Sequence, residues 1–127
     1  EPVGQERIRT PDDFTEEQRA FFRTATQFAD ERVLANAARI ERKDYALVRQ
    51  LLREAGALGL LGLDVPEAYG GLAQDETSSM LVTEAMARLG SWSVTFGAQV
   101  GIGSLPIVYF GTEAQKRRYL PKLVTGE

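Results

Sequence analysis

The acidic side chains are the first residues of this sequence to consider for catalytic chemistry, because the chain contains neither histidine nor cysteine. Histidine is the commonest general base and metal ligand, and because it is absent we consider the carboxylates first. Glu84 lies four residues before Arg88, which is the spacing of a surface ion pair on a helix. Glu16, Glu17 and Glu113 fall in the first turns of expected helices, where acidic residues stabilise the helix terminus. No pattern of paired carboxylates or metal ligands results, so we assign no catalytic residue and no metal site.

Two glycine pairs could be mistaken for phosphate-binding loops. A nucleotide-binding loop needs a preceding strand and a following helix with characteristic residues, and neither is expected beside Gly70 and Gly71. Tyr69-Gly70-Gly71 is typical of a turn. Gly59 and Gly62 indicate tight packing more than a binding site.

Capping residues and helical periodicity predict the elements that position these side chains. Thr15 and Gln18 form the pattern of a capping box, and apolar residues follow it at helical spacing. Thr112 and Gln115 repeat the pattern near the end of the chain. The expected helices run from about Thr15 into the mid-thirties, from about Asp44 to the terminal glycine Gly56, from about Glu76 to Leu89 with Gly90 ending it, from Trp92 to Phe110, and onward from Thr112.

The remaining segments show weaker patterns. Residues 1–13 are polar, contain two prolines and are expected to form a flexible arm. Residues 57–63 are apolar and rich in glycine, a pattern that fits either a buried loop or a strand. Pro121 should kink or stop the last helix. With almost no strand signal, residues 14–127 are predicted to form an all-α bundle of five to six helices.

The segment from Trp92 to Phe110 is apolar nearly all round, with Gly97, Gly101 and Gly103 spaced along it. A helix of this kind is expected to be buried on every side. Few helices of a five-helix bundle can be surrounded completely by their own domain. We therefore expect a neighbouring domain, a second subunit or an apolar ligand to cover the exposed side, and an exposed apolar patch on this chain alone.

Composition excludes several classes of partner. The net charge is −3 and the 15 basic residues are scattered among 18 acidic ones, so no basic stripe suggests nucleic acid. The apolar runs are short and broken by glycines, so no transmembrane span is expected. The first ten residues are charged and resemble no secretory signal, and we expect a cytoplasmic protein.

Two long motifs resemble the acyl-CoA dehydrogenase family. Residues 58–71, LGLLGLDVPEAYGG, are similar to that family's GLLGxxVPExYGG segment, and residues 110–127, FGTEAQKRRYLPKLVTGE, to its FGTExQKxxYLPxLxxGE. Glu84-Ala85-Met86-Ala87-Arg88 stands where the family has an EELAR-like helix. One departure is Leu34-Ala35-Asn36-Ala37, where relatives often carry a proline, so the first helix is expected to run longer here.

The resemblance implies a function and partners. It implies the N-terminal helical domain of an FAD-dependent enzyme that oxidises a fatty acyl-CoA to a trans-2-enoyl-CoA and passes electrons to an electron-transfer flavoprotein. The catalytic base and most flavin contacts would lie in later β-barrel and helical domains, and the full-length protein would form a tetramer or dimer. The helix matching Trp92 to Phe110 lines the acyl cavity in relatives, and Val94, Ala98 and Ile102 form one stripe of it. These three residues are the expected acyl-chain site, which their short side chains would leave deep enough for a medium-to-long chain.

Alternative functions share this architecture. Acyl-CoA oxidases, nitroalkane oxidases and some flavin-dependent monooxygenases have a similar N-terminal helical domain. A non-catalytic helical interaction module is a third possibility, because fold does not determine function. We expect the 127 residues alone to bind no flavin tightly and to be inactive.

Overall fold

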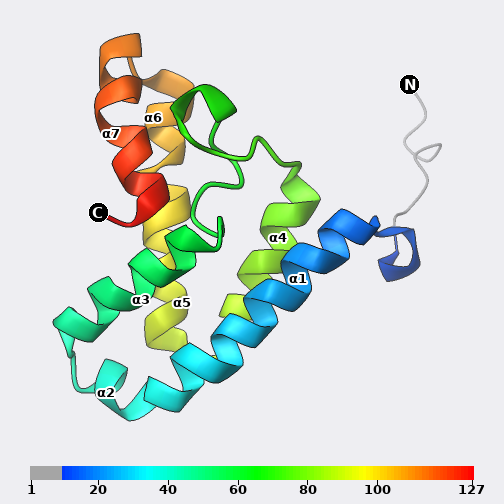
Figure 1. Cartoon of the computed structure of the whole chain (residues 1–127), viewed down its shortest axis with the longest axis vertical. Helices are drawn as coiled ribbons and strands as arrows, with labels where there is room; N and C mark the ends of the chain where they lie inside the picture. The colour runs from blue at the N-terminus through cyan, green and yellow to red at the C-terminus, as the bar shows by residue number, and fades with distance from the viewer. Residues whose placement is uncertain (1–9) are drawn as a thin grey trace, which may run out of the picture.

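The computed structural model describes residues 10–127, and throughout this range the ordered elements are helices (Figure 1). The 3-10 helices are η1, η3 and η4, and the π-helices are η2 and η5. The all-α prediction is confirmed. In chain order the elements are η1 (Pro11–Asp13), α1 (Glu16–Phe28), η2 (Ala29–Val33), η3 (Leu34–Asn36), α2 (Ala37–Glu41), α3 (Tyr45–Ala57), η4 (Glu67–Tyr69), α4 (Glu76–Met86), α5 (Gly90–Gly97), η5 (Ala98–Gly103), α6 (Leu105–Phe110) and α7 (Glu113–Thr125).

The first long helix begins as predicted and runs further than a proline-ended helix would. Thr15 Oγ1 accepts the Gln18 amide at 3.1 Å, and Gln18 Oε1 accepts the Thr15 amide at 2.9 Å. After α1 the chain continues helically through η2 and η3 into α2. The expected arm is only partly described: residues 1–9 lie outside the described range, and Pro11–Asp13 form η1.

The end of α3 corrects the prediction that Gly56 terminates it. Gly56 lies inside α3, and a Cβ there would stand 2.6 Å from the Thr125 carbonyl oxygen. The residue with the left-handed backbone of a helix C-terminus is Gly59, with φ of +78°. Gly56 is therefore required for the close approach of α7, and the segment that follows is a buried loop and not a strand.

Two other boundaries differ from the prediction. The third helix, α4, ends at Met86, and Gly90 opens α5 instead of closing α4. Pro121 does not stop the last helix, since α7 extends to Thr125. The buried side chains of Leu120 and Val124 hold this part of α7 against the core, which offsets the backbone hydrogen bond that proline cannot make.

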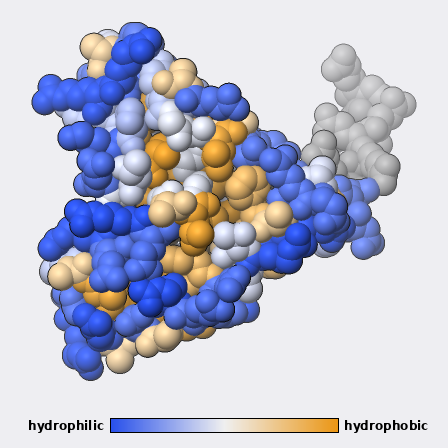
Figure 2. Space-filling model, in the orientation of Figure 1, coloured by the Kyte–Doolittle hydropathy of each residue, from blue (hydrophilic) through white to orange (hydrophobic). Residues whose placement is uncertain are grey.

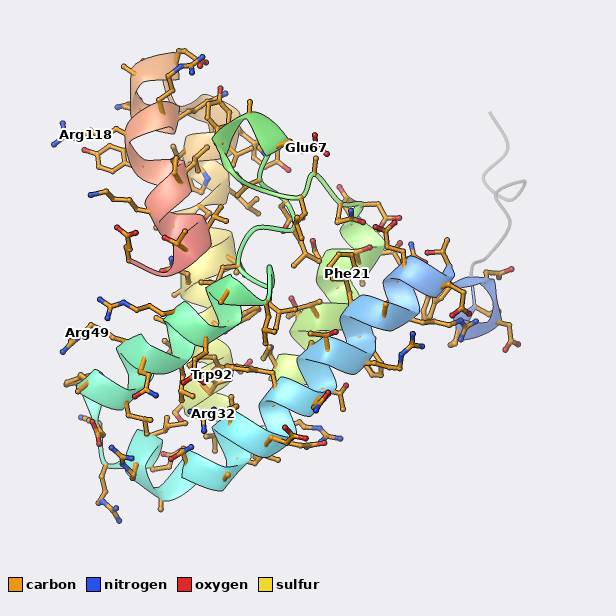
Figure 3. The ribbon with its side chains drawn as sticks, in the orientation of Figure 1. Phe21, Arg32, Arg49, Glu67, Trp92 and Arg118 are labelled. Carbon is orange, nitrogen blue, oxygen red and sulfur yellow. The ribbon has the colours of Figure 1, made fainter. Side chains whose placement is uncertain are left out.

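The core lies where α1, α3, α4 and α5 meet (Figures 1 and 3). Trp92 is fully buried between Phe28 and Phe96, with ring centroids 6.1 and 6.4 Å away. Its indole Nε1 donates to Met86 Sδ at 3.3 Å, which satisfies the buried N–H. A smaller cluster of Val65, Leu120 and Val124 joins the loop to α7.

The helix predicted from Trp92 to Phe110 is confirmed and runs over 21 residues from Gly90 to Phe110. The expectation that glycines break this apolar run into short pieces is wrong. By length and composition alone this helix could cross a membrane, a test that the core helix of a soluble protein also passes. Trp92 and Phe96 on this run belong to the protein's own core.

Candidate functional site

The three residues predicted to meet an acyl chain lie on one outward face of the α5–η5 helix. Val94 is 74% exposed, Ile102 is 81% exposed and Ala98 between them is also exposed. We call these three residues the α5 stripe. Trp92 and Phe96, on the opposite side of the helix, are 0% and 1% exposed. The helix is therefore wrapped by its own chain on one side only.

Further along the same helical run, α6 also exposes large apolar side chains. Tyr109 is 66% exposed and Phe110 is 88% exposed, and their rings pack edge to face at 6.3 Å. By contrast, α1 and α3 present mainly hydrophilic surface on the face seen in Figure 2. These two exposed aromatic residues and the α5 stripe lie on the same helical run, Gly90 to Phe110, and form the exposed apolar surface that the sequence predicted around this helix.

The glycines beside the stripe are not needed for packing within the described residues. A Cβ built on Gly97 or on Gly101 would meet no atom within 4 Å. Gly97 has φ of −62° and ψ of −35°, a helical backbone that any residue adopts. Gly97 and Gly101 therefore do not serve close packing between helices of the described residues. The space beside them faces outward.

Sequence reasoning missed two polar residues that support the stripe. Ser104 is 1% exposed, and its Oγ donates to the Gln99 carbonyl at 2.7 Å across the π-helical turn η5. Gln99 Nε2 donates to the Leu123 carbonyl of α7 at 2.9 Å. The available signal was that Gln99 and Ser104 are the two polar side chains of the otherwise apolar residues 96–108, since a buried polar group needs a partner.

The acidic residues considered for catalysis have structural partners or lie apart from the stripe. Arg88 forms its ion pair with Asp30 of η2, so the expected pairing with Glu84 is corrected. Glu113 Oε1 lies 2.8 Å from Arg117 Nε, and Glu113 Oε2 accepts from Tyr69 Oη at 2.8 Å. That hydrogen bond raises the pKa of Tyr69 above its ordinary value.

A second ion pair links α3 to η2. Arg32 Nε and Nη2 donate to the two carboxylate oxygens of Glu54 at 2.7 and 2.8 Å. The hydrogen bond from Arg32 holds the pKa of Glu54 below its ordinary value. Within residues 10–127 no group of three or more acidic residues could hold a metal ion.

The loop with two glycines does not fit a flavin phosphate. A Cβ on Gly71 would lie 1.9 Å from the Val65 carbonyl oxygen, so the space that a phosphate would need is filled by backbone. The amide of Gly71 donates to Pro66 O at 3.2 Å and that of Leu72 to Gly62 O at 2.9 Å. A phosphate cradle needs free amides. The prediction of a tight turn is confirmed, and this part of the chain supplies no flavin site.

A hollow lies between the start of the described chain, α1 and α4. Its volume is about 430 Å³, and its lining residues are Pro11, Phe14, Arg19, Phe22, Arg23, Leu81 and Glu84. None of its lining residues belongs to the α5 stripe. It is a separate surface feature.

Comparison with known proteins identifies the architecture. The family described as "Acyl-CoA dehydrogenase, N-terminal domain" matches residues 15–127. A probable acyl-CoA dehydrogenase of Bacillus subtilis (strain 168) is 49% identical, over 100% of this chain and 21% of that protein. An acyl-CoA dehydrogenase from Bacillus anthracis, solved in complex with FAD, superposes with a TM-score of 0.91 at 48% identity, covering 94% of this chain and 20% of that one.

Butyryl-CoA dehydrogenase from Megasphaera elsdenii superposes with a TM-score of 0.74 at 32% identity, covering 90% of this chain and 30% of that one. The chain thus spans between 20% and 30% of the length of these three proteins. The match covers the described helices almost completely, including both motifs and the helix that carries the α5 stripe. The chain belongs to the acyl-CoA dehydrogenase family and corresponds to the N-terminal helical domain of its members.

Proposed function

We propose that this domain serves an FAD-dependent acyl-CoA dehydrogenase by forming part of the cavity for the fatty acyl chain. The whole protein would convert an acyl-CoA thioester to the trans-2-enoyl-CoA. FAD and the catalytic base would come from parts of the protein outside these 127 residues. Proton removal next to a thioester requires a polarised carbonyl and a desolvated base, and the α5 stripe supplies neither.

The observation that carries this proposal is the open apolar surface along α5. Val94 and Ile102 are 74% and 81% exposed, and the backbone at Gly97 and Gly101 has free space beside it. Ligand sites for apolar molecules are concave and lined mainly by hydrophobic side chains. A cavity completed by other domains over this face would bury the apolar surface and enclose an extended hydrocarbon chain.

We propose a medium-to-long acyl chain as the preferred substrate. Val94, Ala98 and Ile102 have short side chains, so they leave depth along two helical turns. The opposing candidate is a short chain, because one structural relative is named for butyryl-CoA.

Activity of the full-length enzyme across acyl-CoA substrates of 4 to 16 carbons tests this directly. We expect kcat/KM to rise beyond four carbons, by up to about 15-fold per pair of added methylenes until the slot is filled, since each buried methylene contributes about 0.8 kcal/mol. A maximum at four carbons would refute the chain-length proposal while leaving acyl-CoA oxidation intact.

We also propose that an electron-transfer flavoprotein accepts the electrons, and that the full-length enzyme is a cytoplasmic homo-oligomer, a tetramer or dimer. An acyl-CoA oxidase is the competing activity. Steady-state assays with the flavoprotein or with oxygen as acceptor separate the two: rapid turnover with oxygen alone would replace the dehydrogenase proposal by the oxidase.

A further inference from the structure

The three residues of the α5 stripe stay aligned because the helix changes type between them. In an α-helix with 3.6 residues per turn, residues four apart are offset by about 40° around the axis. Val94, Ala98 and Ile102 would then diverge by about 80° in total. The segment from Ala98 to Gly103 is a π-helix, whose hydrogen bonds run from residue i to i+5 and whose turn holds more than four residues. The offset around the helix axis from Ala98 to Ile102 is therefore opposite in direction to the offset from Val94 to Ala98. Ile102 thus projects on the same side of the helix as Val94.

The exposure of the residues agrees with this geometry. Val94, Ala98 and Ile102 are all exposed, whereas Trp92 and Phe96 face the core. Val100, in the middle of the π-turn, packs against the core. The π-turn thus keeps one straight apolar face on the outside over two turns.

The wide turn is held by two side chains. The Ser104 amide bonds to the Gly101 carbonyl, so this amide does not serve the Gln99 carbonyl. The Ser104 hydroxyl takes that place, donating to Gln99 O at 2.7 Å from a side chain that is 1% exposed. The Gln99 side chain then reaches across to α7 and donates to Leu123 O at 2.9 Å. The hydrogen bond from Ser104 holds the wide turn, and the hydrogen bond from Gln99 fixes the turn against α7.

We infer that Gln99 and Ser104 are positioning residues that hold the π-turn and so determine which acyl chains the α5 stripe accepts. The inference rests on the proposed function, because it assigns the stripe to the acyl chain. Neither residue touches the stripe's outer face: Ser104 is buried, and Gln99 points to α7. Their effect on substrate choice is through the direction in which Ile102 projects.

Ser104→Ala in the full-length enzyme tests the inference. Without the hydroxyl, the Gln99 carbonyl loses the hydrogen bond from Ser104, which removes one stabilising contact of the wide turn. The turn then reverts more readily toward regular α-helix, which swings Ile102 away from the stripe. We expect kcat/KM for hexadecanoyl-CoA to fall by about 10-fold relative to butyryl-CoA, mainly through KM. Ser104→Thr retains the hydroxyl and should restore the ratio to within about threefold of wild type.

Thr83→Ala is the matched control, since Thr83 Oγ1 donates to the Ser79 carbonyl at 2.8 Å in the regular helix α4. This variant should leave the substrate ratio unchanged. If Ser104→Ala does not fold, Gln99→Ala removes the bond to α7 from a half-buried side chain and should shift the ratio in the same direction.

The outcomes separate the inference from the proposed function. A wild-type enzyme that oxidises no acyl-CoA refutes the proposed function and the inference together. A wild-type enzyme that is active, with the same substrate ratio in the folded Ser104→Ala or Gln99→Ala variant, refutes the inference alone. An equal loss for both substrates would show a merely structural role and would also overturn it.

Discussion

Replacing Gly97 by alanine should stabilise the 127-residue chain, because the new methyl group meets nothing and the helix gains propensity. Gly97 closes α5 with φ of −62° and ψ of −35°, and no atom lies within 4 Å of a Cβ built there. Glycine costs a helix about 0.5–1 kcal/mol relative to alanine. We therefore expect the free energy of unfolding to rise by about that amount, and Tm by roughly 2–5 °C for a chain of this size.

The assay is urea unfolding followed by the fluorescence of Trp92. This is the sequence's single tryptophan and it is 0% exposed, so its emission reports loss of the core. Gly56→Ala is the contrasting variant, since its Cβ would lie 2.6 Å from Thr125 O. Overpacking of this kind costs about 1–3 kcal/mol.

In the full-length enzyme Gly97→Ala should lower activity, although it stabilises the 127-residue chain. The same methyl group would project into the proposed acyl slot and lower kcat/KM for long chains more than for short ones. If Gly97→Ala destabilises the 127-residue chain by as much as Gly56→Ala does, the space beside α5 is filled within the domain and the reasoning about an open slot is refuted.

Three further predictions concern the same domain. The hydrogen bond from Arg32 lowers the pKa of Glu54 in the folded state below its ordinary value of 4.5. The pair therefore contributes its full stability above that ordinary value, and the contribution is lost as pH falls through the lower folded pKa. Glu54→Gln should flatten that acid limb in pH-dependent urea titrations, and an unchanged limb would contradict it. Thr15→Ala removes the capping box of α1 and should cost about 1 kcal/mol in the same assay; no loss would show that the cap is dispensable. The 127-residue chain should bind no FAD tightly and oxidise no acyl-CoA, and a yellow, active preparation would disprove this.

The helix starts could be predicted from sequence because they depend on local chemistry. Thr15 and Thr112 each make both hydrogen bonds of a capping box, and Asp44 caps α3 by accepting the Leu47 amide at 3.1 Å. The outward face of Val94 and Ile102 was also predictable, since an apolar helix in a small bundle must expose one side.

Helix ends and the π-turn could not be predicted, because contacts distant in sequence decide them. Gly56 resembles the glycine that ends a helix, but a glycine is needed there because the Thr125 backbone of α7 approaches it closely. Pro121 is tolerated because its neighbours Leu120 and Val124 are anchored in the core. The π-turn depends on a hydroxyl bond from Ser104, and no periodicity in the sequence marks it.

Labelling by a hexadecanoyl-CoA that carries a photoreactive diazirine near the end of its chain would test the central claim most directly. The labelled sites in the full-length enzyme would be mapped by mass spectrometry after proteolysis. Adducts on Val94, Ala98 or Ile102, suppressed by unmodified hexadecanoyl-CoA, are the expected result. Competable adducts confined to other parts of the protein, with none between Gly90 and Phe110, would contradict the assignment of this helix to the acyl chain.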